Sequence, residues 1–306
     1  YSADPLTYVY TPYSTYQFGS RWYITKSPTI TSNVDQGYYL AGEEKAFDVT
    51  MNLPAGGIDL ALMIFDYKLA GVTTADITKF EFFAQDLGQW IVLGSRPYET
   101  YANCTDNTGI CGQFGWAPGG FGPIAAGFTN TTQFRVTFAK GFTAPLSFTL
   151  DLSGKLAVTD TAWTKLTTYT GSMDVYDKPT ITSTDIQGYY LTGEQREFHV
   201  TGTNPLTGGN YTNVKYKVTL PNTVIEDITN IQYYETYPTT GYVPLALTQV
   251  GPDVVAWFGL ADYGGFPMAP GFSDTPSFKV TFATAKVYSV VIEQYDVALD
   301  PDRLLV

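Results

Sequence analysis

An internal repeat is the feature that most constrains how this chain of 306 residues can fold. Residues 28–50 and 179–201 align without a gap at a constant shift of 151, with 15 identities in 23 positions. The same shift places residues 75–83 (ADITKFEFF) on residues 226–234 (EDITNIQYY). Agreement of this kind indicates duplication of a folding unit, and the chain is long enough for two ordinary domains.

The later part of each copy aligns at a smaller shift. Residues 122–138 lie on residues 266–282 at a shift of 144, so the first copy holds seven extra residues before this point. The only two cysteines, Cys104 and Cys111, stand in that excess with six residues between them. Their spacing predicts a local disulfide in an inserted loop, and with it an oxidising, extracellular compartment. A pair of metal-binding thiolates, the alternative, would need more Cys or His nearby.

Each copy has the pattern of successive β-strands. Segments such as residues 45–53 (KAFDVTMNL) and 133–139 (QFRVTFA) alternate apolar and polar residues with a period of two, and Gly, Pro, Asn and Asp separate them. The 24 tyrosines and 19 phenylalanines also favour strands. We therefore predict an all-β fold of two tandem immunoglobulin-like β-sandwich domains with an N-terminal extension. The predicted boundaries are residues 1–25 for the extension, 26–177 for the first domain and 178–306 for the second.

The two copies differ at their ends. The first copy continues into residues 163–175, which we predict to be its last strand. In the second copy Trp163 falls on Leu305 at a shift of 142, so we expect the matching strand to be missing. At the shift of 151, residues 14–25 (STYQFGSRWYIT) fall on residues 165–176 (KLTTYTGSMDVY) of that last strand. The N-terminal extension thus matches the strand that the second domain lacks.

One face of this extension is apolar, because Tyr16, Phe18, Trp22 and Ile24 stand at even spacing. We predict that the segment from about Leu6 to Ile24 completes the second domain of a neighbouring subunit, in the donor-strand mode of β-augmentation. Donor and acceptor are different surfaces, so copies of the chain would join head to tail into a filament. Two alternatives stay open: a two-repeat fragment of a larger surface-layer protein, and an extension that folds back on its own chain.

The repeat also resembles a known class of domains. Residues 179–205 (PTITS…GYYL…GE…EFHVT…NP), 266–282 and 290–305 look like the β-sandwich repeats of large extracellular proteins of bacteria. The resemblance covers nearly all of both domains, less closely in the first, and implies a secreted, surface-associated structural role without catalytic residues. Such repeats are usually strung in one polypeptide. A two-repeat chain with mismatched ends departs from that pattern, which suggests assembly from separate subunits, as in donor-strand pilins.

Composition argues against several function classes. The net charge of −12 would repel a phosphate backbone, so nucleic acid is not an expected partner. No apolar run approaches the length of a membrane-spanning helix. The single histidine, His199, aligns with Asp48, and no Ser–His–Asp or Cys–His set can be assembled. We therefore expect no enzymatic activity, no cofactor and no metal site.

Two sets of residues are relevant to carbohydrate: one to its attachment and the other to its binding. Asn103, Asn130 and Asn210 each head an Asn-X-Ser/Thr triplet, the acceptor motif for N-glycosylation. A carbohydrate- or surface-binding adhesin is the second function class, since exposed aromatic rings can stack on sugars. The aromatic residues considered for that role are Trp90, Trp116, Trp257, Tyr237 and Tyr242.

Overall fold

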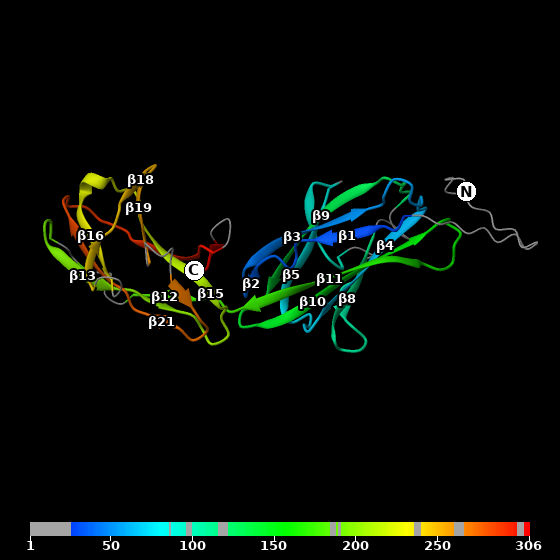
Figure 1. The fold of residues 1–306 in the computed structure, drawn as a ribbon, viewed down its shortest axis with the longest axis horizontal. Helices are drawn as coiled ribbons and strands as arrows, with labels where there is room; N and C mark the ends of the chain where they lie inside the picture. Colours follow the sequence, from blue (N-terminus) through cyan, green and yellow to red (C-terminus); the bar gives the residue numbers. More distant parts are fainter. Residues whose placement is uncertain are drawn as a thin grey trace, which may run out of the picture. The chain divides into compact units, whose positions relative to one another are not determined.

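The computed structural model divides into two compact units, Tyr1–Val175 and Tyr176–Val306, which we call domain 1 and domain 2 (Figure 1). The predicted boundary was after residue 177. The structure describes residues 26–85, 87–95, 100–115, 122–183, 188, 191–235, 240–259, 266–298 and 303–306. Each domain is considered by itself below.

Domain 1 consists of two antiparallel sheets. One has the order β1 (Thr29–Ser32), β3 (Glu44–Asn52), β9 (Thr129–Phe138), β5 (Ile77–Ala84) and β6 (Gln89–Val92). The other has the order β2 (Tyr38–Leu40), β11 (Thr164–Tyr176), β10 (Ala144–Lys155), β4 (Leu62–Ala70), β8 (Gly109–Phe114) and β7 (Ala102–Asn103).

The inner faces of these sheets meet in one hydrophobic core. Phe47 on β3 packs against Phe134 on β9 and Phe148 on β10, with ring centroids 5.5 and 5.6 Å apart. Along β3 the buried residues are Phe47, Val49 and Met51, which alternate with partly exposed ones. This alternation is the period of two that the sequence shows, because successive side chains of a strand point to opposite faces.

Domain 2 repeats this arrangement with shorter strands. Its first two sheets are β12 (Thr180–Thr182), β14 (Thr201–Thr203) and β21 (Ser273–Asp274), and then β13 (Gln195–His199), β22 (Ser277–Phe282), β16 (Ile228–Glu235) and β17 (Gly241–Pro244). The third has the order β18 (Thr248–Val250), β19 (Asp253–Phe258), β15 (Tyr211–Leu220), β23 (Val291–Asp296) and β24 (Arg303–Leu304), with β20 (Phe266–Met268) also paired to β15. A short 3-10 helix, η1 (Ile225–Asp227), precedes β16.

A proline accounts for the division of one sheet. In domain 1, Val49 on β3 pairs with Thr132 on β9. The corresponding residues of domain 2 are Val200 and Pro276, and Val200 donates its N–H to the Pro276 carbonyl (3.1 Å). Proline has no N–H to donate in return, so the ladder is interrupted there and each long strand becomes two short ones. The all-β fold with two tandem immunoglobulin-like sandwiches, predicted from the sequence, is confirmed.

Candidate functional site

The candidate site is the edge of domain 2 formed by β23 and the residues before it. Its counterpart in domain 1 is β10, and the pairing register makes the equivalence firm. Leu150 on β10 lies opposite Tyr67 on β4, and Ile292 on β23 lies opposite Val218 on β15. Leu150 and Ile292 are related by the shift of 142, and Tyr67 and Val218 by the shift of 151. Both are shifts at which the two sequences align.

In domain 1 a full-length strand covers this edge. β11 pairs with β10 from Ala144↔Val175 to Gly154↔Thr164. Two of its side chains enter the core, Met173 and Val175, with exposures of 0% and 1%. Beneath them the β10 residues Leu146, Phe148 and Leu150 are equally buried (3%, 1% and 0%).

In domain 2 the described residues include a counterpart of the beginning of this strand. β24 pairs with the end of β23, at Tyr295↔Leu304 and Asp296↔Arg303. Gln294 then donates its N–H to the Val306 carbonyl and accepts a hydrogen bond from the Leu305 N–H, both at 2.7 Å.

The expectation that domain 2 lacks its last strand altogether was therefore wrong. Leu305, with an exposure of 0%, takes the place of Leu166 rather than that of Trp163. The shift here is 139 rather than 142, because the connection between the last two strands is three residues shorter in domain 2. Val306 accordingly takes the place of Thr167.

Beyond Val306 the edge has no partner among the described residues. We call this stretch, residues 288–293, the open edge. Three of its residues, Tyr288, Val290 and Ile292, are equivalent to the buried Leu146, Phe148 and Leu150 but are only partly buried. Residues at a spacing of two direct their N–H and C=O groups to the same side of a strand. The backbone groups of Ile292 therefore face the same way as those of Gln294, toward the side of β23 that corresponds to the side of β10 covered by β11 in domain 1.

The first residue of the open edge, Tyr288, and the segment before it are fixed by contacts within domain 2. The Tyr288 ring stacks on Phe282, with centroids 3.8 Å apart, and its hydroxyl donates to the Thr284 carbonyl (2.8 Å). The Lys286 ammonium group donates to the Asp227 carboxylate and holds the pKa of that carboxyl below its usual value. The open edge is thus bounded by an anchored segment on one side and by β24 on the other.

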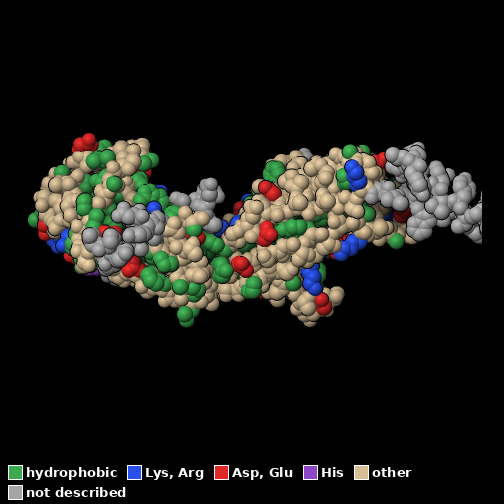
Figure 2. Space-filling model, in the orientation of Figure 1, with side chains coloured by type: hydrophobic (Ala, Val, Ile, Leu, Met, Phe, Trp, Pro, Cys, Tyr) green, Lys and Arg blue, Asp and Glu red, His purple; other side chains and the backbone are tan. Residues whose placement is uncertain are grey.

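Hydrophobic exposure is greater in domain 2 as a whole. Among the described residues, nine of the 13 exposed large hydrophobic side chains belong to domain 2, including Val291 (44%) within the open edge. Figure 2 shows the same contrast on the face that it displays, where hydrophobic side chains are denser over domain 2. An uncovered apolar edge with unpaired backbone groups is a template for another strand.

The predicted donor residues Tyr16, Phe18, Trp22 and Ile24 lie outside the described residues. Their counterparts in domain 1 nevertheless indicate how deeply each donor side chain would be buried. Trp22 and Ile24 correspond to Met173 and Val175, which are fully buried, whereas Phe18 and Tyr16 correspond to Tyr169 and Thr167, which are partly buried. In the register of β11, Phe18 would lie opposite Ile292 and Trp22 opposite Tyr288. Tyr16 would take the position that Val306 already occupies.

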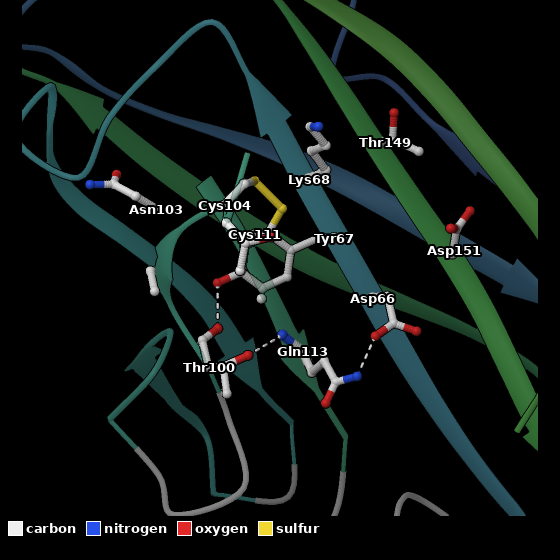
Figure 3. Close-up of a pocket in the computed structure, with 13 residues that line it drawn as sticks. Asp66, Tyr67, Lys68, Thr100, Asn103, Cys104, Cys111, Gln113, Thr149 and Asp151 are labelled. Atoms are coloured by element: carbon white, nitrogen blue, oxygen red, sulfur yellow. Dashed lines mark hydrogen bonds between the residues drawn. A yellow bond between two sulfur atoms is a disulfide. The ribbon is translucent and has the colours of Figure 1, made fainter. Parts of the chain in front are cut away.

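Cys104 and Cys111 form a disulfide in domain 1. It joins the start of the loop between β7 and β8 to β8 itself, beside a hollow of about 470 Å³ (Figure 3). The Tyr67 hydroxyl donates to the Thr100 carbonyl (2.8 Å) at the back of this hollow. Inside the loop, the Thr108 hydroxyl and N–H and the Lys68 ammonium group bind the Asp106 carboxylate and lower its pKa to about 2.

The three sequon asparagines lie in different surroundings. Asn103 is exposed, but its side-chain oxygen accepts a hydrogen bond from the Thr74 N–H (2.9 Å). Asn130 is partly buried on β9, and its amide donates to the Thr132 hydroxyl (3.4 Å). Asn210 is exposed immediately before β15.

The aromatic residues considered for sugar binding are dispersed. Trp90 packs under the Arg135 guanidinium group (4.2 Å) in domain 1. In domain 2, Trp257 is 40% exposed and packs against Tyr295, while Tyr242 lies in a different sheet under the Lys279 ammonium group (3.6 Å). Trp116 and Tyr237 lie outside the described residues.

The described residues contain no group of three or more His, Cys, Asp and Glu side chains arranged to hold a metal ion. In the same residues no helix has the length and apolar character needed to span a membrane.

No protein-family model and no curated protein sequence matches the chain. Among solved structures, it is similar to the C-terminal domain of the Streptococcus agalactiae antigen I/II polypeptide BspA (11% identity, 87% of this chain, 95% of that chain, TM-score 0.36). It is also similar to domains D2 and D3 of the major pilin SpaD from Corynebacterium diphtheriae (13% identity, 90% and 88%, TM-score 0.31). A third similar structure is AvmM, which catalyses macrocyclization in alchivemycin A biosynthesis (13% identity, 55% and 96%, TM-score 0.37).

Proposed function

We propose that this protein is a non-catalytic structural subunit of an extracellular, pilus-like filament. Each subunit would insert part of its N-terminal extension into the open edge of domain 2 of the next. The observation that carries the proposal is the contrast between equivalent residues: Phe148 and Leu150 are buried under β11, whereas Val290 and Ile292 are partly exposed. At the shift of 151 the extension falls on β11, the strand that makes this difference, and places Trp22 and Ile24 on the apolar positions of Met173 and Val175.

The position of β24 limits which residues of the N-terminal extension can form the donor strand. Val306 takes the place of Thr167, and Gln17 aligns with Thr168. The donor would therefore continue β24 without a gap, and residues 17–25 would occupy the positions equivalent to residues 168–176 of β11. Residues before Gln17 would lie outside this groove.

The gain from insertion is large enough to hold a joint. Trp22 and Ile24 would be buried like Met173 and Val175, and Tyr288, Val290 and Ile292 would become covered. At ~1.5 to 3 kcal/mol for each of the two donor side chains, their burial gives a gross ~3 to 6 kcal/mol, before the costs of ordering and association. The three acceptor side chains are already partly buried and add a smaller amount, and the new backbone hydrogen bonds add to it. Because donor and acceptor are different surfaces, repetition gives an open chain unless its rotation closes a ring.

The remaining features are compatible with this role. The disulfide between Cys104 and Cys111 fits an oxidising location outside the cell. The partner would be another copy of the same chain, and the joint needs no cofactor, because backbone hydrogen bonds and apolar contacts supply its affinity.

A matched pair of substitutions tests the donor. Trp22→Asp places a charge where domain 1 buries Met173, and should abolish assembly. Tyr23→Asp adds the same charge one position along, where domain 1 already has the exposed Asp174, and should assemble like the unchanged chain. Electron microscopy and light scattering of the purified proteins give the readout. Equal assembly of the two variants would contradict the proposal.

A second experiment tests the acceptor and its register. Residues 17–25 (QFGSRWYIT) fused directly after Val306 should fill the open edge from within and yield a monomer. The same fusion with one extra glycine after Val306 shifts the strand by one residue and turns its apolar face outward, so assembly should persist. If the unfused chain is itself a stable monomer with β23 protected from hydrogen exchange, the fragment or fold-back alternative applies instead.

A further inference from the structure

Domain 2 contains a pocket of about 360 Å³ on the side of β15 that faces β19, whereas the open edge lies on the other side, at β23. Strands from several parts of domain 2 contribute to it. Its aromatic lining residues are Tyr216, Tyr233, Tyr234, Phe258, Phe266 and Phe272. Two carboxylates, Glu235 and Asp274, also line the pocket.

Comparison with domain 1 shows that the three tyrosines and the two carboxylates of this pocket are specific to the second copy. At the shift of 151, the three tyrosines replace phenylalanines, and Glu235 replaces Ala84. At the shift of 144, Asp274 replaces Asn130. The registers agree, since Phe82 lies opposite Phe134 and Tyr233 lies opposite Phe278. Two copies of one fold thus differ at five positions that meet in one pocket.

The rings form a compact aromatic wall. Tyr216 stacks on Phe258 with centroids 4.6 Å apart, and Phe266 lies 5.8 Å from Tyr216. Tyr233 lies 5.7 Å from Phe258. The faces of such rings carry negative potential, which attracts a cation within about 6 Å.

The carboxylates add negative charge in the same place. Glu235 accepts a hydrogen bond from the Tyr233 hydroxyl (2.9 Å). Asp274 is partly buried, and burial raises its pKa above the usual value. Among the described residues neither carboxylate has a Lys or Arg partner in a salt bridge. The adjoining segments 236–239 and 260–265 contain no Lys or Arg.

We propose that this pocket binds an organic ammonium group. Aromatic faces and carboxylates both favour a cation, and the partly buried setting strengthens the attraction between unlike charges. A volume of about 360 Å³ lies within the range of small-molecule sites. The ammonium group belongs either to a free small molecule or to a lysine side chain of another protein.

Titration calorimetry of the full chain with choline and with Nα-acetyl-lysine methylamide tests the proposal and distinguishes these sources. Binding of choline indicates a free amine ligand, and binding of the lysine derivative alone indicates a protein side chain. The neutral isostere of choline, 3,3-dimethylbutanol, should bind at least tenfold more weakly than choline. If neither ammonium probe binds, or if the neutral isostere binds as tightly as choline, the proposal is overturned.

Substitutions taken from domain 1 give the second readout. Glu235→Ala and Asp274→Asn each introduce the residue that the first copy already has, so the fold should tolerate them. Each should weaken binding of the ammonium probe at least tenfold. Glu226→Gln, which changes a carboxylate on η1 outside the pocket, should have no effect. Unchanged affinity in both pocket variants, or displacement of the probe by neutral saccharides, would refute the assignment. Because assembly depends on the other edge of β15, the same variants should still polymerise.

Discussion

A steric conflict between Gly202 and Tyr216 gives the sharpest test of how the core of domain 2 is built. A Cβ atom added at Gly202 on β14 would lie 2.0 Å from the Tyr216 hydroxyl oxygen and 2.9 Å from the Gln294 Nε2 atom. All three residues are buried. Domain 1 has Met51, Phe65 and Leu152 at the equivalent positions, which combine a large residue with a ring that has no hydroxyl. The small residue at Gly202 therefore makes room for the hydroxyl group of Tyr216.

The expected cost of Gly202→Ala follows from this geometry. The Tyr216 ring or β14 must move by about 1 Å or more, and overpacking of this kind costs about 1–3 kcal/mol. Loss of glycine flexibility in the unfolded chain returns about 0.4–1 kcal/mol. Tyr216→Phe removes the atom at 2.0 Å. The closest remaining atoms are the Gln294 Nε2 atom at 2.9 Å, at the end of a flexible side chain, and the ring carbon Cζ at 3.1 Å, so only small adjustments are needed. The double variant should therefore be more stable than Gly202→Ala alone, with a coupling of about 1–2 kcal/mol.

The coupling is measured in the full chain as differences in the free energy of unfolding in urea. Hydrogen exchange of peptides from β15 is the readout that reports on domain 2. Tyr233→Phe is the control, because Tyr233 lies on β16 and its hydroxyl bonds to Glu235 rather than facing Gly202. Added to Gly202→Ala, it should give no rescue. Strict additivity of Gly202→Ala and Tyr216→Phe, within about 0.5 kcal/mol, would refute the reasoning.

Domain 1 offers three simpler tests. Arg135→Met should destabilise it by about 2–3 kcal/mol in thermal unfolding, because the buried Glu81 carboxylate loses its guanidinium partner; Glu81→Gln in the same chain should restore part of the loss. Replacing Cys104 and Cys111 by Ser opens a loop with a sequence separation of 7 and should cost about 2.5 kcal/mol in urea, so a change below 0.5 kcal/mol would disagree with the loop-entropy account. Asp106, with a folded pKa of about 2 against a usual value of 3.8, contributes stability above the usual pKa that is lost as the pH falls toward 2; an NMR titration midpoint near 3.8 would contradict this.

The fold could be predicted from the sequence because the two copies share the same alternation of apolar and polar residues along their strands. Phe47 and Phe198 align at the shift of 151 and are both buried, at 2% and 3%. A period of two fixes which face of a strand is buried, so strands such as β3 could be predicted without coordinates.

The last strand of domain 2 could not be placed in this way. Carrying the shift of 142 past β23 put Leu305 at the position of Trp163, whereas pairing with β23 puts it at that of Leu166. A turn can lose three residues without leaving identities that reveal the loss. The register is fixed by the pairing of β24 with β23, by the hydrogen bond that Gln294 accepts from the Leu305 N–H and by the one that it donates to the Val306 carbonyl.

The ammonium pocket was missed for a different reason. Tyr216 and Tyr233 alternate with polar neighbours like any core residue, and Glu235 and Asp274 stand 39 residues apart in the sequence. The signal was present in the repeat, as tyrosine for phenylalanine and acid for neutral residue, but it has meaning only when the positions are known to meet. Substitutions between duplicated domains that cluster in space therefore identify where the copies have acquired different roles. In this chain five such substitutions, at Tyr216, Tyr233, Tyr234, Glu235 and Asp274, meet in the aromatic pocket of domain 2.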